Sequence, residues 1–547
     1  MTIEIDQSHC SGCSYCVLGC PVHAIRLEID RDTWPVIDAA LCTECGECLY
    51  LCPNNVFSAA WLEAKPAAVQ DNYDVIVIGS GIGGLMAAAG ISRAGKKVLV
   101  LEQLSFIGGK YTQLSYAGYA ITTAAWTCPG PKSRIGKLCT KLDAPIQWVT
   151  IHDVKSRGEH WVLTRDGRRF GSTDEAQEAL VGGSKGMSTV YRWIADMYDP
   201  AISYPDDMTA RQYIESYFPG NKDYVDYVQT IITYCFASQT VDTFSANETK
   251  HAIVDALEQM AVWGTAVGGT SAIVKGLEAV IFGHGGEIVT KTRVESILLE
   301  GGRAVGVKLK DGRSIHASVV VHDAGIKRLL QLVGEENFPQ AYVAHLKGVV
   351  PAVVAALILG LNQDLLGKDH SLLHTMGWER TINSYAPTFF DPHLAPSGKH
   401  MLDVFWVMEP PYNLKHEIEL VKGQLRQVYP HYDQSVELEV PMFFRGGWTA
   451  EMAHRLGQSG TQRLDPISPI PGLYLVGYDC IGYGMAGDII PHGVEKALYT
   501  ILGDPQYKSE DEKRSSWFSK KAKSGLFRLM AVGQDFKSKV GYKNPQS

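Results

Sequence analysis

Short runs of apolar residues alternate with glycine-rich and polar stretches through most of the chain. The run at 73–78 is almost entirely apolar, as expected for a strand of a parallel sheet that is buried on both faces. Glycines follow it, and the pattern then predicts a helix from about Gly83 to Ala94 and a second strand at 97–101. A further strand, predicted at 473–476, precedes another glycine-rich turn. This succession of strands and helices predicts an α/β fold.

Two other stretches have different patterns. The segment at 151–262 contains three tyrosine-rich runs that predict helices, YRWIADMYDP, MTARQYIESYF and DYVDYVQTIITYCF. Tyrosines at helical spacing more often belong to a core or its rim than to a ligand site. The longest apolar run, 349–361, is shorter than the roughly 18 residues of a bilayer-spanning helix, and it contains Pro351. A buried strand explains this run better.

The C-terminal tail, 506–547, is amphipathic and strongly basic from Lys513 to Lys543, where Asp535 is almost the only acid. Its large apolar residues recur at helical spacing, with Trp517 and Phe527 beside the stripe that they form. The stripe consists of Phe518, Leu526, Leu529, Met530, Phe536 and Val540. A basic amphipathic helix can lie in a membrane interface. The alternative is a helix packed on its own protein or on a partner, and both interpretations stay open.

A chain of 547 residues is too long for one core and indicates about two to four domains. The net charge of −8 gives no reason to expect a nucleic-acid partner. The N-terminal residues lack the basic region and apolar run of a signal peptide. We therefore expect a cytoplasmic protein, unless the segment 513–543 attaches it peripherally to a membrane.

Eight of the twelve cysteines lie in two copies of the pattern C-x2-C-x2-C-x3-C-P near the N-terminus. A cubane iron–sulfur cluster needs four thiolates, and in the two-cluster arrangement the fourth comes from the other copy of the pattern. The predicted ligands of one [4Fe–4S] cluster are Cys10, Cys13, Cys16 and Cys52. The predicted ligands of the other [4Fe–4S] cluster are Cys42, Cys45, Cys48 and Cys20.

Zinc and disulfide bonds are the rival interpretations of these cysteines. Zinc needs only four ligands and has no use for the proline that closes each copy. The segment 1–62 resembles the bacterial two-cluster ferredoxins over its whole length, and the resemblance implies an α+β module that carries electrons. The scattered cysteines outside the motif are expected to be free. They are Cys128, Cys139, Cys235 and Cys480.

A dinucleotide-binding motif, G-x-G-x-x-G, follows the strand at 73–78. Its glycines permit a tight turn at Gly79, close approach of a pyrophosphate at Gly81, and packing of helix on strand at Gly84. The helix that begins near Gly83 directs its N-terminus, where N–H groups are free, at the phosphates. Glu102, at the end of the next strand, is placed to hydrogen-bond a ribose hydroxyl.

Three segments around and beyond this motif resemble the phytoene desaturase, carotenoid isomerase and retinol saturase branch of the flavin amine oxidase-like proteins. They are the motif with its following GGK, the middle segment 268–325, and PGLYLVGYDCIGYGMAGDIIPHGVEKAL near the C-terminus. The resemblance runs from Tyr73 to about Leu502. It implies noncovalently bound FAD, with the motif glycines at the pyrophosphate and Glu102 at the adenosine ribose.

The resemblance also implies which residues lie nearest the flavin. Those beside the flavin would be Gly108, Gly109 and Lys110, and those on the ribityl–phosphate side would be Gly477 and Asp479. The chain departs from the family at Lys110, where these proteins usually carry arginine. It also departs in GYAITTAAWTCPGP, which lacks the acidic residue often found there.

Because the flavin segments are discontinuous, the stretches between them should form a substrate domain. The predicted order is a ferredoxin module at 1–62, a linker at 63–72, an FAD-dependent oxidoreductase at 73–505 and the tail at 506–547. The Rossmann-like FAD-binding parts are expected at about 73–150, 263–344 and 466–505. The inserted mixed substrate parts are expected at about 151–262 and 345–465. A large aromatic and aliphatic cap over a flavin suits an apolar substrate.

The chain has no second strand–GxGxxG–helix unit, so the clusters are the recognisable route for electrons to or from an external donor or acceptor protein. Ferredoxin-type clusters often have potentials near about −0.4 V. Sending electrons from an alkane to such a cluster would cost more than about 10 kcal/mol, at about 1.4 kcal/mol per 30 mV. This argument favours reduction of a C=C bond in an apolar substrate such as an isoprenoid. The alternatives are a dehydrogenase or desaturase that exports electrons, and a non-catalytic electron relay.

Asp488 and His492 are the candidate catalytic residues. They lie four residues apart at the start of the last predicted helix, and therefore on one face, next to the turn expected at the flavin. Such a pair can deliver or remove a proton at carbon. The alternative is a helix-capping aspartate and a structural histidine. Cys480 and Tyr483 are weaker candidates nearby.

Overall fold

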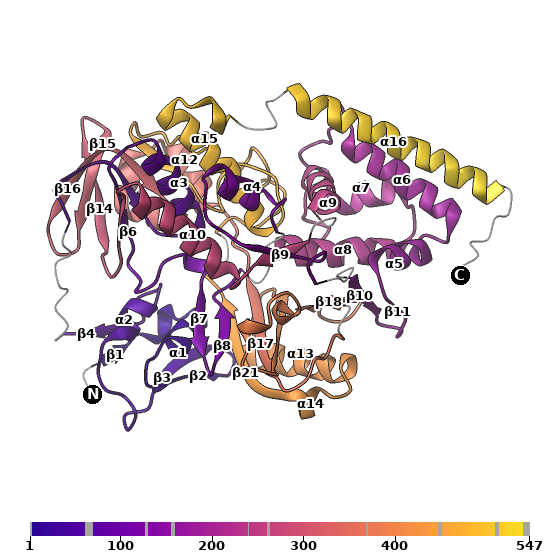
Figure 1. Cartoon of the computed structure of the whole chain (residues 1–547), viewed down its shortest axis with the longest axis horizontal. Coiled ribbons are helices and arrows are strands. Elements are labelled where there is room, and N and C mark those ends of the chain that lie inside the picture. The colour runs from indigo at the N-terminus through magenta and orange to yellow at the C-terminus, as the bar shows by residue number, and fades with distance from the viewer. Residues whose placement is uncertain are drawn as a thin grey trace.

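The chain folds around two large mixed sheets (Figure 1). A small N-terminal module lies below the first sheet and beside the second, and a group of helices lies on the opposite side of the molecule. The computed structural model describes residues 3–60, 69–125, 130–154, 159–238, 240–259, 263–367, 370–446, 451–508 and 514–539. Most of the predicted linker at 63–72, Cys128 and the end of the tail therefore lie outside the described residues.

The N-terminal module contains two short antiparallel pairs of strands and two short helices. The strand pairs are β1 (Ile3–Ile5) with β4 (Phe57–Ala59) and β2 (Ile25–Ile29) with β3 (Thr33–Ile37). The helices are α1 (Tyr15–Leu18) and α2 (Glu47–Leu51). Each helix begins inside one copy of the cysteine motif. The pairing of β1 with β4 closes the module by joining its two ends.

The first large sheet has the order β13-β6-β5-β16-β15-β14, and β22 pairs with β16. Its parallel strands are β13 (Glu287–Val289), β6 (Val98–Leu101), β5 (Asn72–Ile78), β16 (Ser314–His322) and β22 (Leu473–Leu475). Its antiparallel strands are β14 (Val294–Glu300) and β15 (Arg303–Leu309). The three strands expected from the apolar runs at 73–78, 97–101 and 473–476 are thus confirmed.

Helices cover both faces of this sheet. One face carries α3 (Ile82–Arg93), α4 (Arg134–Lys141), α10 (Thr270–Gly283) and α15 (Ile490–Leu502), and the other carries α11 (Ile326–Val333) and α12 (Gln340–Lys347). Val75 and Val77 of β5 pack towards α3, whereas Ile76 and Ile78 pack towards α11. Burial of both faces is the reason that the sequence of β5 is apolar without alternation.

The second large sheet has the order β11-β10-β18-β19-β20-β17-β21. Its strands are β10 (Glu159–Thr164), β11 (Arg169–Phe170), β17 (Val354–Leu361), β18 (His370–Met376), β19 (Asn383–Tyr385), β20 (His400–Val407) and β21 (Val436–Phe444). All eight residues of β17 are buried, which confirms that the apolar run at 349–361 contains a buried strand. Helices α13 (Leu414–Val428) and α14 (Tyr432–Ser435) pack on its outer face.

Five helices form a cap beside the two sheets: α5 (Thr173–Leu180), α6 (Ser184–Tyr198), α7 (Ala210–Tyr217), α8 (Lys222–Phe236) and α9 (Ala246–Gln259). The three tyrosine-rich runs lie in α6, α7 and α8, as predicted. Tyr198, Tyr213, Tyr224 and Tyr227 belong to the core of the cap. Two short antiparallel pairs lie between the sheets, β7 (Gln113–Tyr116) with β8 (Tyr119–Thr122) and β9 (Trp148–Thr150) with β12 (Gly264–Ala266).

The N-terminal module is docked against both large sheets. Tyr15 of α1 is fully buried and donates a hydrogen bond to the carbonyl of Thr123 (2.6 Å). The N–H of Phe443, a residue of β21, donates to the carbonyl of Gly12 (2.9 Å). Arg445 holds the same cysteine loop by donating to the carbonyls of Ser11 and Cys10 (3.2 and 3.1 Å). The module is therefore packed into the protein along its first cysteine loop.

The C-terminal helix α16 (Arg514–Lys539) lies along α6 on the outer side of the cap (Figure 1). Phe527 stacks on Tyr198, with 5.5 Å between ring centroids, and Ala531 is buried. Helix packing on the protein's own surface, one of the two interpretations of the tail, is thus confirmed. The packed side, however, holds Phe527, whereas Leu526, Leu529 and Met530 of the predicted stripe are exposed. Among the described helices, none is both long enough and apolar enough to cross a bilayer.

Docking of the module through Tyr15 predicts a large effect of truncating this side chain. Tyr15→Ala should destabilise the protein by about 3 kcal/mol or more, because it leaves a cavity among buried aromatic and aliphatic residues. Tyr15→Phe should cost only about 1 kcal/mol, the contribution of one hydrogen bond. The measurement is anoxic denaturant unfolding, followed by cluster absorbance.

The matched control is Leu41→Ala, which truncates a half-exposed side chain of the same module. Its effect should stay within about 0.5 kcal/mol. Equal midpoints for Tyr15→Ala and Leu41→Ala would show that the module does not depend on this contact.

Candidate functional site

A cavity of about 1110 Å³ lies where the N-terminal module, the first sheet and the second sheet meet. The module contributes Cys10 and the loop 53–56 to its wall. The first sheet contributes the ends of its parallel strands, and the second contributes Val354, Phe405 and Val407. Ligands of open α/β sheets bind beyond the carboxyl ends of the strands, and this cavity occupies that position.

The glycine motif forms one end of the cavity, at the N-terminus of α3. Gly79 has a φ of +95°, a conformation that favours glycine and makes the turn from β5 into the helix. A Cβ added at Gly84 would lie 2.3 Å from the carbonyl oxygen of Gly79, so no larger residue fits there. The first turn of α3 therefore directs backbone N–H groups towards the cavity, where that of Gly84 donates to the Asp323 carboxyl group (2.8 Å). A helix N-terminus of this kind suits an anionic phosphate.

Most of the predicted cofactor-binding residues line this cavity: Gly79, Gly81, Gly83, Glu102, Gly108, Gly109, Lys110, Gly477 and Asp479. Gly84 lies just behind them. The Glu102 carboxylate accepts hydrogen bonds from the N–H and hydroxyl of Ser80 (2.9 and 2.7 Å) and from the N–H of Leu104 (2.8 Å). Burial raises the pKa of Glu102. The roles of these cofactor-binding residues stay predictions, but the arrangement of the residues fits a dinucleotide.

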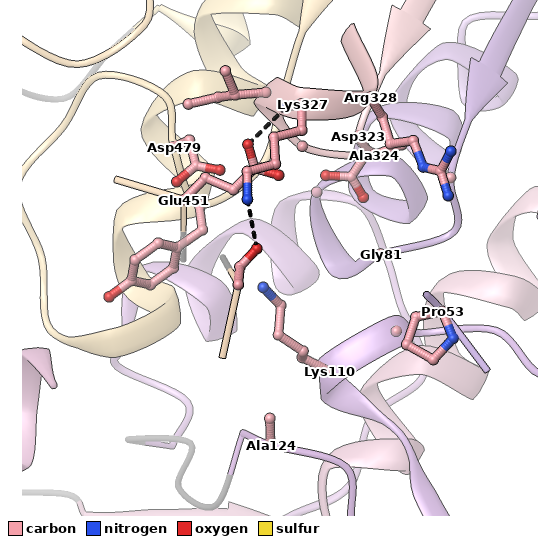
Figure 2. Close-up of a pocket in the computed structure, with 18 of the residues that line it drawn as sticks. Pro53, Gly81, Lys110, Ala124, Asp323, Ala324, Lys327, Arg328, Glu451 and Asp479 are labelled. Carbon is pink, nitrogen blue, oxygen red and sulfur yellow. Dashed lines mark hydrogen bonds between the residues drawn. The ribbon is translucent and has the colours of Figure 1, made fainter. Parts of the chain in front are cut away.

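Lys110 points into the cavity towards a group of acids, as Figure 2 shows. Burial lowers the pKa of Lys110, and the charges of Asp479, Asp323 and Glu451 oppose this shift. Burial and the neighbouring charge of Asp479 raise the pKa of Glu451 to about 7. This half of the cavity is polar and highly charged.

Another part of the cavity wall is apolar. Its wall is built from Val354, Phe405 and Val407 of the second sheet and from Tyr234 and Phe236 of α8. The ring of Tyr234 stacks on Phe405, with 5.7 Å between centroids. This part can enclose an apolar molecule and exclude water from it.

A buried chain of hydrogen bonds reaches the cavity at Tyr478, between Gly477 and Asp479. The Tyr478 hydroxyl is 2.8 Å from Nε2 of His454, and Nδ1 of His454 hydrogen-bonds the carboxylate of Glu248. Ser459 donates a second hydrogen bond to this carboxylate. Glu248 is fully buried and His454 is only 1% exposed. The chain Tyr478–His454–Glu248 can hold or move a proton at the cavity wall.

The candidate catalytic pair does not line the cavity. Asp488 is fully buried, and its carboxylate accepts hydrogen bonds from the N–H groups of Arg134 and Ile135 (2.9 and 3.1 Å) at the start of α4. His492 donates from Nε2 to the carbonyl of Tyr483 (2.9 Å). These contacts favour the capping and structural alternatives, and the catalytic role of the pair stays a prediction. Of the two weaker candidates, Cys480 lines the cavity and Tyr483 does not.

The eight cysteines of the motif fall into two groups in space. A small pocket is lined by Cys10, Cys13, Cys16 and Cys52, so the last cysteine of the second copy lies with the first three of the first copy. Cys48, in turn, faces Cys42, Cys45 and Cys20. This is the crossed arrangement predicted for two [4Fe–4S] clusters. The assignment of individual ligands stays a prediction.

The chemistry of each group fits an iron–sulfur cluster. Burial, with repulsion from neighbouring cysteines, raises the pKa of Cys13 and Cys48 to about 12. Crowded buried thiolates are therefore costly unless a cationic group binds them. The Val56 N–H donates to the sulfur of Cys52 (3.4 Å), and the Ala24 N–H donates to that of Cys20 (3.3 Å). Among the described residues, no three His, Cys, Asp or Glu side chains are placed to hold a single metal ion.

The two cysteine groups differ in their surroundings. Cys10 of the first group forms part of the cavity wall. In the second group Cys45 is exposed, and the neighbouring Leu41 is 52% exposed. One predicted cluster therefore lies against the cavity, and the other lies towards solvent.

Several residues of the site were not singled out by sequence reasoning. Asp323 follows directly after the buried strand β16, and an acid at the carboxyl end of a parallel strand is a signal that could have identified it. Arg445, Glu451 and the chain Tyr478–His454–Glu248 gave no such signal, because their contacts join segments far apart in sequence.

Comparison with known protein families gives two matches. The sequence model of the family of flavin containing amine oxidoreductases matches residues 82–494. The model of the 4Fe-4S dicluster domain matches residues 9–56. The matches agree with a chain that binds FAD and two [4Fe–4S] clusters.

The chain is also similar to individual proteins. The chloroplastic prolycopene isomerase 1 of an Oncidium hybrid cultivar is 25% identical over 533 residues, covering 82% of this chain and 90% of that protein. The all-trans-retinol 13,14-reductase of Macaca fascicularis is 26% identical over 298 residues, covering 47% of this chain and 48% of that protein. The crystal structure of an oxidoreductase from Methanosarcina mazei has a TM-score of 0.67 at 24% identity, covering 79% of this chain and all of that one.

The crossed arrangement of cysteines predicts which cluster each substitution damages. Cys52→Ser should harm the same cluster as Cys13→Ser, and Cys20→Ser should harm the same cluster as Cys45→Ser. Each variant should keep about four of about eight irons, and paired variants should give matching electron paramagnetic resonance spectra. Cys20→Ser protein whose spectrum matches that of Cys13→Ser would refute the arrangement.

Proposed function

The chain belongs to the flavin containing amine oxidoreductase family, and from this we propose that it reduces a C=C bond of an apolar substrate with electrons that enter through its iron–sulfur module. At the coarser level the protein is an oxidoreductase that depends on FAD and on two [4Fe–4S] clusters. The direction of electron flow, the isoprenoid class of substrate and the roles of individual residues belong to the proposal.

The observation that carries this proposal is the position of the first cysteine loop. Cys10 lies in the wall of the cavity that the glycine motif also lines. Arg445 fixes this loop to the second sheet, and Arg445 itself lines the cavity. Electrons that reach the first predicted cluster therefore arrive at the cavity in which FAD and substrate would bind.

The potentials of the two partners set the direction. When bound, FAD accepts single electrons from clusters and delivers electron pairs to a substrate. Two electrons and two protons convert one C=C bond into CH–CH, and a low-potential one-electron carrier protein must supply the electrons. With clusters near about −0.4 V this direction is downhill, and the reverse is uphill by more than about 10 kcal/mol. The carrier would dock near the exposed Cys45 and Leu41.

The residues that line the cavity have two proposed roles, enclosing the substrate and supplying a proton. Phe405, Val407 and Tyr234 enclose the apolar substrate and keep water from it. Tyr478 is the proposed proton donor at its phenolic oxygen, and His454 returns a proton to that oxygen from Nε2. The Glu248 carboxylate hydrogen-bonds Nδ1 of His454 and holds the ring in this orientation. A positioned acid of this kind contributes about 10²–10⁴-fold to a proton-transfer step.

Anoxic redox titration tests the direction. Dithionite-reduced protein mixed with an apolar polyene, such as a carotenoid or retinoid, should be reoxidised, and the product should be two mass units heavier. Reduction of the oxidised protein by a more saturated substrate would instead indicate a dehydrogenase. No response to either class would indicate an electron relay that serves a partner.

The proton chain predicts a selective defect in one variant. Tyr478→Phe should lower the rate of polyene reduction about 10²-fold, because the variant lacks the donated proton. Dithionite reduction of FAD and of the clusters should be unchanged. Tyr483→Phe is the matched control and should keep the wild-type rate, since Tyr483 stacks on His251 away from the cavity. If Tyr478→Phe kept the wild-type rate and His492→Ala were defective, His492 would be the proton donor instead.

The outer face of α16 is the proposed site of peripheral membrane contact. Leu526, Leu529 and Val532 are 57%, 71% and 65% exposed, on the side of α16 opposite Phe527. Lys521 and Arg528 pair with acids of the cap and fix the orientation of the helix. The side chains of Trp517, Phe518, Phe536 and Val540 lie outside the described residues. A large exposed apolar face on a basic helix suits an anionic lipid surface.

Vesicle binding tests this contact. The wild-type protein should sediment with vesicles that contain anionic phosphatidylserine, and the double variant L526E/L529E should bind at least about tenfold more weakly. Phe282→Glu is the control, since it places one glutamate at an exposed apolar residue of another helix, α10. Equal binding by all three proteins would contradict the proposal. A change of oligomeric state in L526E/L529E alone would assign the face to a protein contact.

A further inference from the structure

The carboxyl group of Asp323 lies beside the glycine motif, at the N-terminus of α3. Asp323 directly follows β16, and its backbone N–H donates to the carbonyl of Ile78 (2.8 Å), which holds it beside β5. Its Oδ2 accepts a hydrogen bond from the N–H of Gly84 (2.8 Å) in the first turn of α3. The carboxyl group thus sits at the N-terminus of the same helix that faces the cavity.

The fit around this carboxyl group is close. A Cβ placed on Gly81 would lie 2.3 Å from Oδ2 of Asp323, and a Cβ placed on Gly477 would lie 2.6 Å from Oδ1. Glycines from two separate segments therefore make room for one side chain. Figure 2 shows Asp323 beside Gly81 at the edge of the pocket.

The charges around Asp323 do not favour an ionised carboxylate. Within the part of the chain that the structure describes, no cation lies within ion-pair distance of it. Burial opposes ionisation of this group, as do the charges of Glu102 and Asp479, whereas the Gly84 hydrogen bond and the Lys110 charge favour it. On α11, the Lys327 ammonium donates to the carbonyl of Gly446 (2.9 Å), and the Lys327 backbone N–H donates to the Glu451 carboxylate (2.7 Å). Arg328 is engaged by Gln331 (3.1 Å).

We propose that Asp323 carries a proton when FAD is bound and donates it in a hydrogen bond to the pyrophosphate, while its other oxygen caps α3. Two adjacent anions in a site with little water are costly, whereas a protonated carboxyl group both accepts from Gly84 and donates to a phosphate oxygen. The proposal relies on the predicted position of the pyrophosphate, and it is independent of the substrate and of the direction of electron flow.

This arrangement couples FAD affinity to pH. Burial raises the pKa of Asp323 to about 8 in the protein without cofactor. Below this pH the group is already protonated, so binding needs no further proton. Above this pH, binding of each FAD requires uptake of one proton by the protein. The dissociation constant for FAD should therefore rise about tenfold per pH unit.

The test measures free FAD by its fluorescence after dilution of the anoxic holoenzyme at pH 7, 8 and 9. The wild-type dissociation constant should rise about tenfold between pH 7 and pH 9. In Asp323→Asn the rise should be less than about twofold, because the amide accepts from Gly84 and donates to a phosphate at every pH. Affinity at pH 7 should stay within about threefold of the wild type.

Glu451→Gln is the matched control, because Glu451 lines the same cavity and has a raised pKa near 7. It should keep the wild-type pH dependence. If Glu451→Gln lost the pH dependence of the FAD dissociation constant, the proposal would be overturned. It would also be overturned if Asp323→Asn kept that dependence. The titrating group would then be Glu451 or Lys110. A wild-type dissociation constant that is flat from pH 7 to pH 9 would overturn it without any variant. Cluster absorbance and the unfolding midpoint of Asp323→Asn confirm that the variant is folded.

Discussion

The close approach of three backbone segments at the N-terminus of α3 is the constraint on which the rest of the structure depends. The first turn of α3, the end of β16 and the turn after β22 all meet there, with glycine at Gly81, Gly84 and Gly477 and one carboxyl group, Asp323, between them. Parallel pairing brings these segments together, because it places the carboxyl ends of β5, β16 and β22 at one edge of the sheet. A side chain at any of these glycines would close the space that a pyrophosphate needs.

The second feature that organises the site is the docked N-terminal module. Its first cysteine loop is held by hydrogen bonds from the Phe443 N–H and the Arg445 guanidinium, and by the buried ring of Tyr15. Cys10 thereby becomes part of the cavity wall, while Cys45 stays at the surface. An electron carrier fused to an oxidoreductase by a flexible linker would not need these contacts. Their presence supports a fixed path from the surface to the cavity.

The cavity itself is divided between charge and apolar surface. Lys110, Asp323, Glu451 and Asp479 surround the end that suits a cofactor, and burial shifts the pKa of three of these groups towards their neutral forms. The other end is enclosed by aliphatic and aromatic side chains of the second sheet and of α8. A site of this kind binds a polar cofactor at one end and excludes water from an apolar reaction at the other.

The sequence by itself determined the parts whose signal is local. Eight cysteines at fixed spacing, a glycine motif between a buried strand and a helix, and the tyrosine-rich helices each follow from residues near one another in the chain. Only the tertiary structure decided what depends on contacts between distant segments. It placed Cys10 at the cavity, turned Phe527 rather than Leu529 towards the cap, and joined Tyr478 to His454 and Glu248. The spacing of Asp488 and His492 on one helix could not reveal that Asp488 caps α4, because the N–H groups it accepts from lie more than 350 residues earlier.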